Sequence, residues 1–346
     1  MNLKSMASAH ESHHDTGSRL VEVPSSPDPG LALATAALVA LHAPSIHNTQ
    51  PWHWRVGVDM LELFADERWR LQIADPDGRL MILSCGAALH HVRVALRAMG
   101  YLPAVHRFPE PGRPDLLARV TLERSIDVVP QALDALRATL SRQTDRRDLD
   151  DAVVPLGALD AMRQAAGSAG AWLHIMNQEQ ARKVIATAER AEGIEIADPD
   201  SRAELRAWTE RPPNDTAGIP EGVLPLRGSD YQPSGRYAVL YGNGDRPSSW
   251  LRGGEALSAI WLAATNHGLV LRPISSVIEV PAARAKLHHA LFGMGCPYLL
   301  VRIGWAAEDG EIPGTPRRPV DESIELVSPP ASSGPDRLAA DRGGKP

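Results

Sequence analysis

The feature that most constrains the fold is a repeated segment. The stretch GEALSAIWLAATNHG at 254–268 has the layout of GAALHHVRVALRAMG at 86–100, at a constant offset of 168. The offset matches Gly86 with Gly254, Ala88 with Ala256, Leu89 with Leu257, Ala95 with Ala263 and Gly100 with Gly268. Alternating, strand-like segments follow both copies, at 118–124 and 298–305. Shared helix-packing chemistry would also produce such identities, but the repeated order of elements favours a duplicated unit.

Composition excludes several classes of protein. The chain has 346 residues and a net charge of −6, which argues against nucleic acid as a partner. No run of eighteen apolar residues is present, so we expect no membrane span. Cys85 and Cys296 form no disulfide framework, and the N-terminus has no apolar signal segment. A reducing, cytoplasmic location is therefore expected.

Arginine supplies almost all the positive charge, since the only lysines are Lys4, Lys183, Lys286 and Lys345. A compositional bias of the coding sequence explains this for most positions. Arginine also suits planar, bidentate contacts with anions, so arginine-rich segments require a closer examination.

We divide the chain into four parts. Residues 1–29 are polar and end in a Ser/Pro cluster, which predicts a disordered arm, and 328–346 resemble them. The first module spans 30–130 and the second 131–327. Within the second, 209–235 hold five prolines and four glycines, which exclude regular structure. A lid over a pocket and a disordered insertion both remain open for this segment.

Local patterns predict the helices of both modules. Residues 31–43 are apolar nearly all round, which indicates a buried helix that ends before Pro44. Ser84 is the expected N-cap of the next helix, which stops at Gly100. Further helices are expected within 131–149, ending in a polar, arginine-rich turn, and within 153–171.

Three polar clusters contain the candidate functional residues. Pro44–Trp52, with the sequence PSIHNTQPW, places many donors and acceptors directly after a buried helix. Arg142–Arg147, with the sequence RQTDRR, combines arginines with a hydroxyl and could surround a phosphate. Arg317 and Arg318 stand between Pro316 and Pro319. Each cluster also has a simpler interpretation, as a self-satisfied turn, a solvated helix end or an exposed loop.

The sequence contains none of the motifs that would indicate a serine hydrolase, a zinc protease or a P-loop nucleotide-binding enzyme. The chain has no GxSxG, HExxH or P-loop sequence. The adjacent histidines His90 and His91 would point about 100° apart on a helix, as would His288 and His289, so we expect no metal site.

The three clusters resemble motifs of the FMN-dependent nitroreductases. PSIHNTQPW is similar to the family segment PSxxNxQPW, and RQTDR followed by Pro155 resembles its RRSxR…PVP start. Gly268-Leu269 with Pro273-Ile274-Ser275 is similar to the segment beside the flavin, and Arg317-Arg318-Pro319 to its C-terminal Arg-x-Pro. The tandem form is most similar to mycobacterial acg-type NAD(P)H nitroreductases. The resemblance covers about 31–326 and implies an α+β fold in which central mixed sheets are flanked by helices.

The order of the motifs implies complementation between modules. In ordinary members RRSxR precedes PSxxNxQPW in each chain, and two chains build two sites at a dimer interface. Here the first module has only PSIHNTQPW and the second only RQTDR. The resemblance therefore implies a covalent pseudo-dimer with one FMN site, which needs no second chain and is compatible with a monomer.

The resemblance assigns cofactor-binding roles by position and implies no catalytic residue. Expected around the ring are Pro44, Ser45, Ile46, Asn48, Gln50, Gln143, Pro273, Ile274 and Ser275. Expected around the phosphate or ribityl chain are Arg142, Thr144, Arg146 and Arg317, with Arg318 nearby. His47 occupies a variable position and receives no role.

Two departures leave the activity open. Many family members have a Glu where Ser275 stands, and a basic residue where Thr315 stands. The resemblance implies ping-pong reduction of a nitroaromatic or quinone by NAD(P)H through FMN, which would supply the redox chemistry. A rival interpretation is a flavin-sequestering protein, active in stress or dormancy, whose lid excludes nicotinamide; a vestigial module without cofactor is a third.

Overall fold

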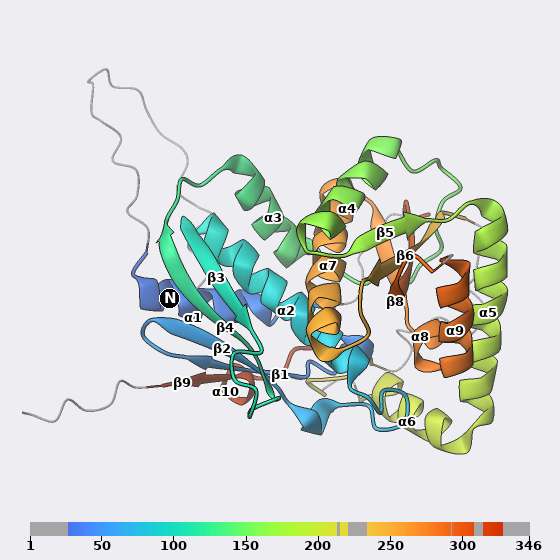
Figure 1. Ribbon diagram of the computed structural model, residues 1–346, viewed down its shortest axis with the longest axis horizontal. Coiled ribbons are helices and arrows are strands. Elements are labelled where there is room, and N and C mark those ends of the chain that lie inside the picture. Colours follow the sequence, from blue (N-terminus) through green and yellow to red (C-terminus); the bar gives the residue numbers. More distant parts are fainter. Residues whose placement is uncertain (1–26, 213–214, 221–233, 292, 308–313, 328–346) are drawn as a thin grey trace, which may run out of the picture.

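The computed structural model describes residues 27–212, 215–220, 234–291, 293–307 and 314–327. Two sheets, one from each half of the chain, lie on either side of a central pair of long helices (Figure 1). Most of the N-terminal arm, most of the proline-rich segment 209–235 and the C-terminal tail lie outside the described residues. The α+β fold with flanked sheets agrees with the prediction.

The first sheet has the strand order β3-β4-β2-β1-β9. Its strands are β1 (Trp52–Val56), β2 (Met60–Ala65), β3 (Tyr101–Arg107), β4 (Leu116–Ser125) and β9 (Ile324–Leu326). All neighbours are antiparallel except β1 and β9, which run parallel with Trp54 opposite Ile324. Because β9 lies at the end of the second module, that module completes the sheet of the first half.

The second sheet has the order β5-β6-β8-β7, with every neighbouring pair antiparallel. Its strands are β5 (Trp172–Ile175), β6 (Arg236–Gly242), β7 (Val270–Ile274) and β8 (Cys296–Gly304). β8 is central and almost entirely buried, as expected for an apolar strand between two neighbours. β7 ends at Ile274, which places Ser275 at the sheet edge.

Helices cover both sheets. In the first half these are α1 (Pro29–Ala40), α2 (Arg79–Ala98), α3 (Pro130–Ser141) and the short turns η2 (Ile46–Asn48) and η3 (Glu67–Trp69). In the second half they are α4 (Leu156–Ser168), α5 (Gln178–Ala197), α6 (Pro199–Thr209), α7 (Pro247–Asn266), α8 (Ser276–Glu279), α9 (Pro281–Ala290) and α10 (Val320–Ser323). No helix in the described residues is long and apolar enough to cross a membrane.

The repeated glycines are the crossing point of α2 and α7. A Cβ at Gly86 would lie 2.1 Å from the Leu251 carbonyl oxygen, and one at Gly254 would lie 1.8 Å from that of Leu83. Only glycine allows the backbones to approach this closely. Near the crossing His90 Nδ1 lies 2.8 Å from Ser258 Oγ, and these residues are also 168 positions apart. The sequence repeat therefore meets itself across the contact between the halves.

A buried carboxylate joins the two halves beside this crossing. Glu255 on α7 is fully buried. Its Oε2 forms ion pairs with Arg93 Nη1 of α2 at 3.1 Å and with Arg107 Nη2 of β3 at 2.6 Å. A buried charge is tolerated when it is paired and hydrogen-bonded in this way. These two ion pairs add specific polar contacts between the halves, beside that of His90 with Ser258.

One predicted helix boundary is wrong. α2 begins at Arg79, so Ser84 is not an N-cap; its hydroxyl donates to the Leu80 carbonyl at 2.7 Å inside the helix. The N-cap is Gly78, and Asp75 accepts the Met81 amide at 2.8 Å in that first turn. The helix expected within 131–149 is confirmed: it ends at Ser141, because Arg142 adopts a non-helical conformation, and the arginine-rich turn follows.

Candidate functional site

The loop after α1 has a strained backbone. His47, Asn48 and Gln50 have φ values of 41°, 56° and 51°, in the left-handed region that non-glycine residues rarely adopt. The Ser45 hydroxyl accepts the Gln50 amide at 2.9 Å, and the Ser84 hydroxyl accepts the Ile46 amide at 3.1 Å. Such clustered strain persists only where surrounding contacts enforce it, and it is typical of ligand sites.

Asn48 and Gln50 connect this loop to distant segments. Asn48 Nδ2 donates to the carbonyls of Gly218 at 2.9 Å and Pro316 at 3.0 Å. Gln50 Nε2 donates to the Thr216 carbonyl at 3.0 Å. The described part of the proline-rich segment therefore lies directly against the predicted flavin loop.

Arg142 reaches the same loop from the other module. Its side chain is buried, stacks 4.7 Å from the Trp261 ring centroid, and donates through Nη2 to the His42 carbonyl at 3.3 Å. Its Nε and Nη1 are shielded from solvent without a partner among the described residues. Burial, and next the nearby charge of Arg317, lower the pKa of Arg142 to about 9.

Arg317 and Arg146 complete a group of three cations around the loop. Arg317 Nη1 donates to the Ala43 carbonyl at 2.8 Å, and Nη2 to that of His42 at 3.3 Å. Burial lowers the pKa of Arg317 and of Arg146 to about 10. Burial also lowers the pKa of His47 to about 4, with a further contribution from the charge of Arg146.

This arrangement fits an anionic ligand. No carboxylate within the described ranges pairs with Arg142, Arg146 or Arg317, although burying an uncompensated cation is costly. His91 of α2 is also fully buried, and neither ring nitrogen has a hydrogen-bond partner in the described part of the chain. Burial and then the charge of Arg142 keep its pKa well below the usual value. A phosphate would satisfy the two unpaired donors of Arg142.

The other predicted residues lie in varied surroundings. Gln143 is exposed and Thr144 is half-buried. Pro273, Ile274 and Ser275 lie at the end of β7, where the neighbouring Arg272 donates to the Arg146 carbonyl at 3.3 Å. Pro44 and Ile46 are partly exposed on the strained loop.

Arg318 differs from Arg317 in its contacts. Its amide donates to Gln50 Oε1 and its Nη1 to the Gln50 carbonyl, both at 2.9 Å. Its guanidinium lies 4.3 Å from the Trp69 ring centroid and 3.8 Å from Asp66. Through these contacts the Arg318 side chain holds the strained loop in place.

Helix α6 contacts the segment that follows β2, from Trp69 to Ala74. Glu204 accepts the backbone amides of Gln72, Ile73 and Ala74 at 2.5 to 3.2 Å. Trp208 packs against Trp69 with the ring centroids 6.1 Å apart. From the end of α6 the chain returns along Asn48, where the Gly218 amide donates to its carbonyl at 3.1 Å.

Sequence patterns missed several of these residues. Trp261, His91 and Glu204 lie on helices whose local sequence indicates only packing or solvent exposure. Their significance comes from partners far away in the chain. The one available signal was Trp261, an aromatic residue within the repeated segment that could have been matched with the arginine-rich turn.

The chain matches no family model. It is 36% identical over 315 residues to a Mycobacterium tuberculosis protein whose name places it provisionally among the NAD(P)H nitroreductases, covering 84% of this chain and 90% of the relative. The acg protein of the same organism, named in the same way, is 33% identical over 319 residues, covering 85% and 95%.

Solved structures with a similar fold include two flavin enzymes. A nitroreductase from Bacteroides fragilis with bound FMN has a TM-score of 0.41 at 17% identity, covering 56% of this chain and 98% of its own. The FMN-dependent nitroreductase NfnB of Mycobacterium smegmatis, in complex with NADPH, has a TM-score of 0.42 at 15% identity, covering 57% and 100%. The two Mycobacterium tuberculosis relatives, in contrast, are more than 30% identical to this chain along most of their length. This protein therefore belongs to the tandem, acg-type branch of the NAD(P)H nitroreductase family.

Proposed function

We propose that the chain binds one FMN between its halves and reduces a small nitroaromatic or quinone with NAD(P)H. The observation that carries this proposal is the group of Arg142, Arg146 and Arg317, whose cations have no carboxylate partner among the described residues. A dianionic phosphate with an aromatic group attached matches both these cations and the strained polar loop beside them.

Each segment would then perform a separate task. Arg142, Arg146 and Arg317 would hold the phosphate by charge-assisted hydrogen bonds, with Thr144 and His91 adding donors. Pro44 to Asn48 would support one face of the ring, and Pro273 to Ser275 would lie at its reactive edge. Arg318 and Gln50 would fix the loop rather than contact the phosphate. When bound, the flavin supplies hydride transfer from NAD(P)H to the acceptor.

A flavin-sequestering protein is the second candidate. The observation that favours it is the contact of Thr216 and Gly218 with Gln50 and Asn48, which closes the described part of the proline-rich segment over the loop. If this closure were permanent, nicotinamide could not stack on the ring, and bound flavin would remain oxidised.

Anaerobic reduction separates the two candidates. Purified protein is expected to be yellow, and NADPH without oxygen is expected to bleach the flavin band within seconds to minutes. Addition of a quinone or nitroaromatic should restore the band. The measurement is visible absorbance in a sealed cuvette, with dithionite as the control for reducible flavin. A band that persists with NADPH but disappears with dithionite would support sequestration.

Substitution Glu204→Ala tests whether α6 controls access. The backbone amides of residues 72–74 lose a charged acceptor worth about 1.5–3 kcal/mol. We therefore expect the state in which α6 is detached from these residues to become about 10-fold or more populated. The expected result is faster bleaching and faster proteolysis near α6. Glu210→Ala, which removes an exposed residue whose one ion pair among the described residues is with Arg206 at 3.7 Å, is the matched control. Identical bleaching rates in the two variants would exclude a gating role for α6.

A further inference from the structure

A pair of carboxyl groups lies beside the end of β7. Glu279 is the last residue of α8, and its side chain contacts the Ser275 hydroxyl and the carboxyl of Glu195 on α5. Glu195 Oε1 is shielded from solvent and has no hydrogen-bond donor among the described residues. Two ionised carboxylates in this position would repel each other, whereas one shared proton would bridge them and satisfy the unpaired oxygen.

Several carboxylates lie near the pair, whereas the two cations of the adjoining crevice, Arg79 and Arg284, are engaged by other partners. Glu192 on the same helix adds negative charge beside Glu195, while Asp75 and Glu204 add it beside Glu279. Burial is the largest effect, and together with these charges it raises the pKa of both carboxyls well above the usual range. The pair therefore titrates as a unit and retains a proton at neutral pH.

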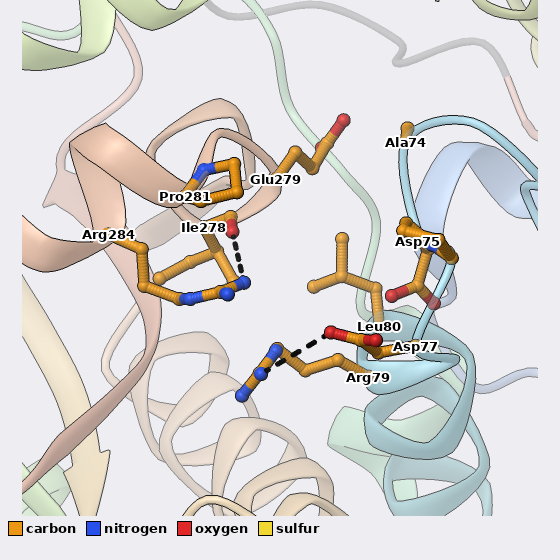
Figure 2. Close-up of a pocket in the computed structure, with 10 residues that line it drawn as sticks. Ala74, Asp75, Asp77, Arg79, Leu80, Ile278, Glu279, Pro281 and Arg284 are labelled. Atoms are coloured by element: carbon orange, nitrogen blue, oxygen red, sulfur yellow. Dashed lines mark hydrogen bonds and ion pairs between the residues drawn. The ribbon is translucent and has the colours of Figure 1, made fainter.

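The pair has a route to solvent. Glu279 lines a small crevice between residues 74–80 and the α8–α9 segment. Arg79 and Arg284 line the same crevice from the two halves (Figure 2). Arg79 is engaged by Asp245 and Asp77, and Arg284 donates to the Ile278 carbonyl at 3.0 Å. The crevice thus connects Glu279 with water at a point where its proton can be replaced.

We propose that Glu279, sharing a proton with Glu195, is the proton source of the site and acts through Ser275 on the reduced acceptor. This rests on the proposed function. Two-electron reduction of a quinone takes up one hydride, which reduced flavin supplies, and one proton on oxygen. The carboxyl O–H bond of the pair breaks, the O–H bond of the hydroquinone forms by way of the Ser275 hydroxyl, and water in the crevice returns a proton to the pair. The Glu absent at position 275 is thereby replaced from one helical turn further along the chain.

The first test counts protons in the full-length protein and needs no turnover. At neutral pH the folded protein should hold about one proton that the unfolded chain, with ordinary carboxyl pKa values, does not. Unfolding should therefore release about one proton more in the wild type than in the double variant Glu195→Gln with Glu279→Gln, because burial alone keeps the pKa of a single remaining carboxyl raised. Because the folded pKa values are raised, this contribution to stability is full at low pH and is lost between about pH 5 and about pH 9. Calorimetry in buffers of different ionisation enthalpy measures the released protons.

The second test separates the two half-reactions. In Glu279→Gln we expect flavin content and anaerobic bleaching by NADPH to stay within about 2-fold, while reoxidation by a quinone slows about 100-fold. The fall of the reoxidation rate at alkaline pH should also disappear. Glu189→Gln, an exposed residue on α5, is the control and should behave as wild type in both tests.

The outcomes distinguish this proposal from the proposed function. Equal proton release in wild type and all variants would overturn the shared proton, and unchanged reoxidation with an unchanged pH profile would overturn the proton-source role. A wild-type protein without flavin, or one that NADPH does not bleach, would refute the reductase proposal and with it the proton-source role, while the proton count would still decide whether the pair exists.

Discussion

Protein carrying Arg142→Ala together with Arg146→Ala is expected to be colourless after purification. Each arginine would make charge-assisted hydrogen bonds worth about 1.5–3 kcal/mol to the phosphate, so the double change should weaken FMN binding by about 100-fold or more. Both side chains come from the turn after α3, and neither has a carboxylate partner among the described residues that would be left unpaired. Flavin content per chain, measured by absorbance after denaturation, checks the expectation.

Folding should survive this double substitution, which makes the test interpretable. Removing cations whose pKa values are lowered by burial relieves a cost in the flavin-free protein, so its melting temperature should be unchanged or higher. The matched control is Arg137→Ala on α3, an exposed arginine paired with Asp134 at 2.7 Å, which should retain full flavin. Full FMN occupancy in the double variant would refute the phosphate assignment.

A Gly254→Ala variant is expected to lose stability by at least about 3 kcal/mol, because overpacking at this crossing cannot be relieved by a side-chain movement. The new Cβ would lie 1.8 Å from the Leu83 carbonyl oxygen and 2.9 Å from the Gly86 Cα, so whole backbones must separate. Separation would also disturb the nearby pairing of Glu255 with Arg93 and Arg107. Chemical denaturation, monitored by circular dichroism, measures the change.

Gly193→Ala provides the control for a change from glycine to alanine inside a helix. Gly193 lies within α5, and a Cβ there would meet nothing within 4 Å. Better helix propensity should then stabilise that variant by about 0.5–1 kcal/mol. If both variants had the same stability as wild type, close packing of α2 on α7 would not be what joins the two halves.

The segments proposed to bind the cofactor could be selected from sequence because each is local. PSIHNTQPW, RQTDR and the arginines before Pro319 are short runs whose residue types already indicate polar, anion-directed chemistry. The repeated helix likewise follows from apolar periodicity and its glycines. Helix starts were less accessible: α2 begins five residues before Ser84 because Gly78 and Asp75 form its first turn, and Ser84 instead bonds to Leu80 within the helix.

The sequence by itself determined the repeated helix, by its apolar period, and the resemblance of short motifs to the nitroreductase family, which implied the α+β class and the segments proposed to bind a flavin. Only the tertiary structure decided which residues meet. It brought Arg142 to the His42 carbonyl, Glu204 to the amides of Gln72 to Ala74, and Glu195 to Glu279, and it returned β9 to the first sheet. These partners are many tens of residues apart, and their approach is set by helix crossing and sheet pairing rather than by any local preference of the chain.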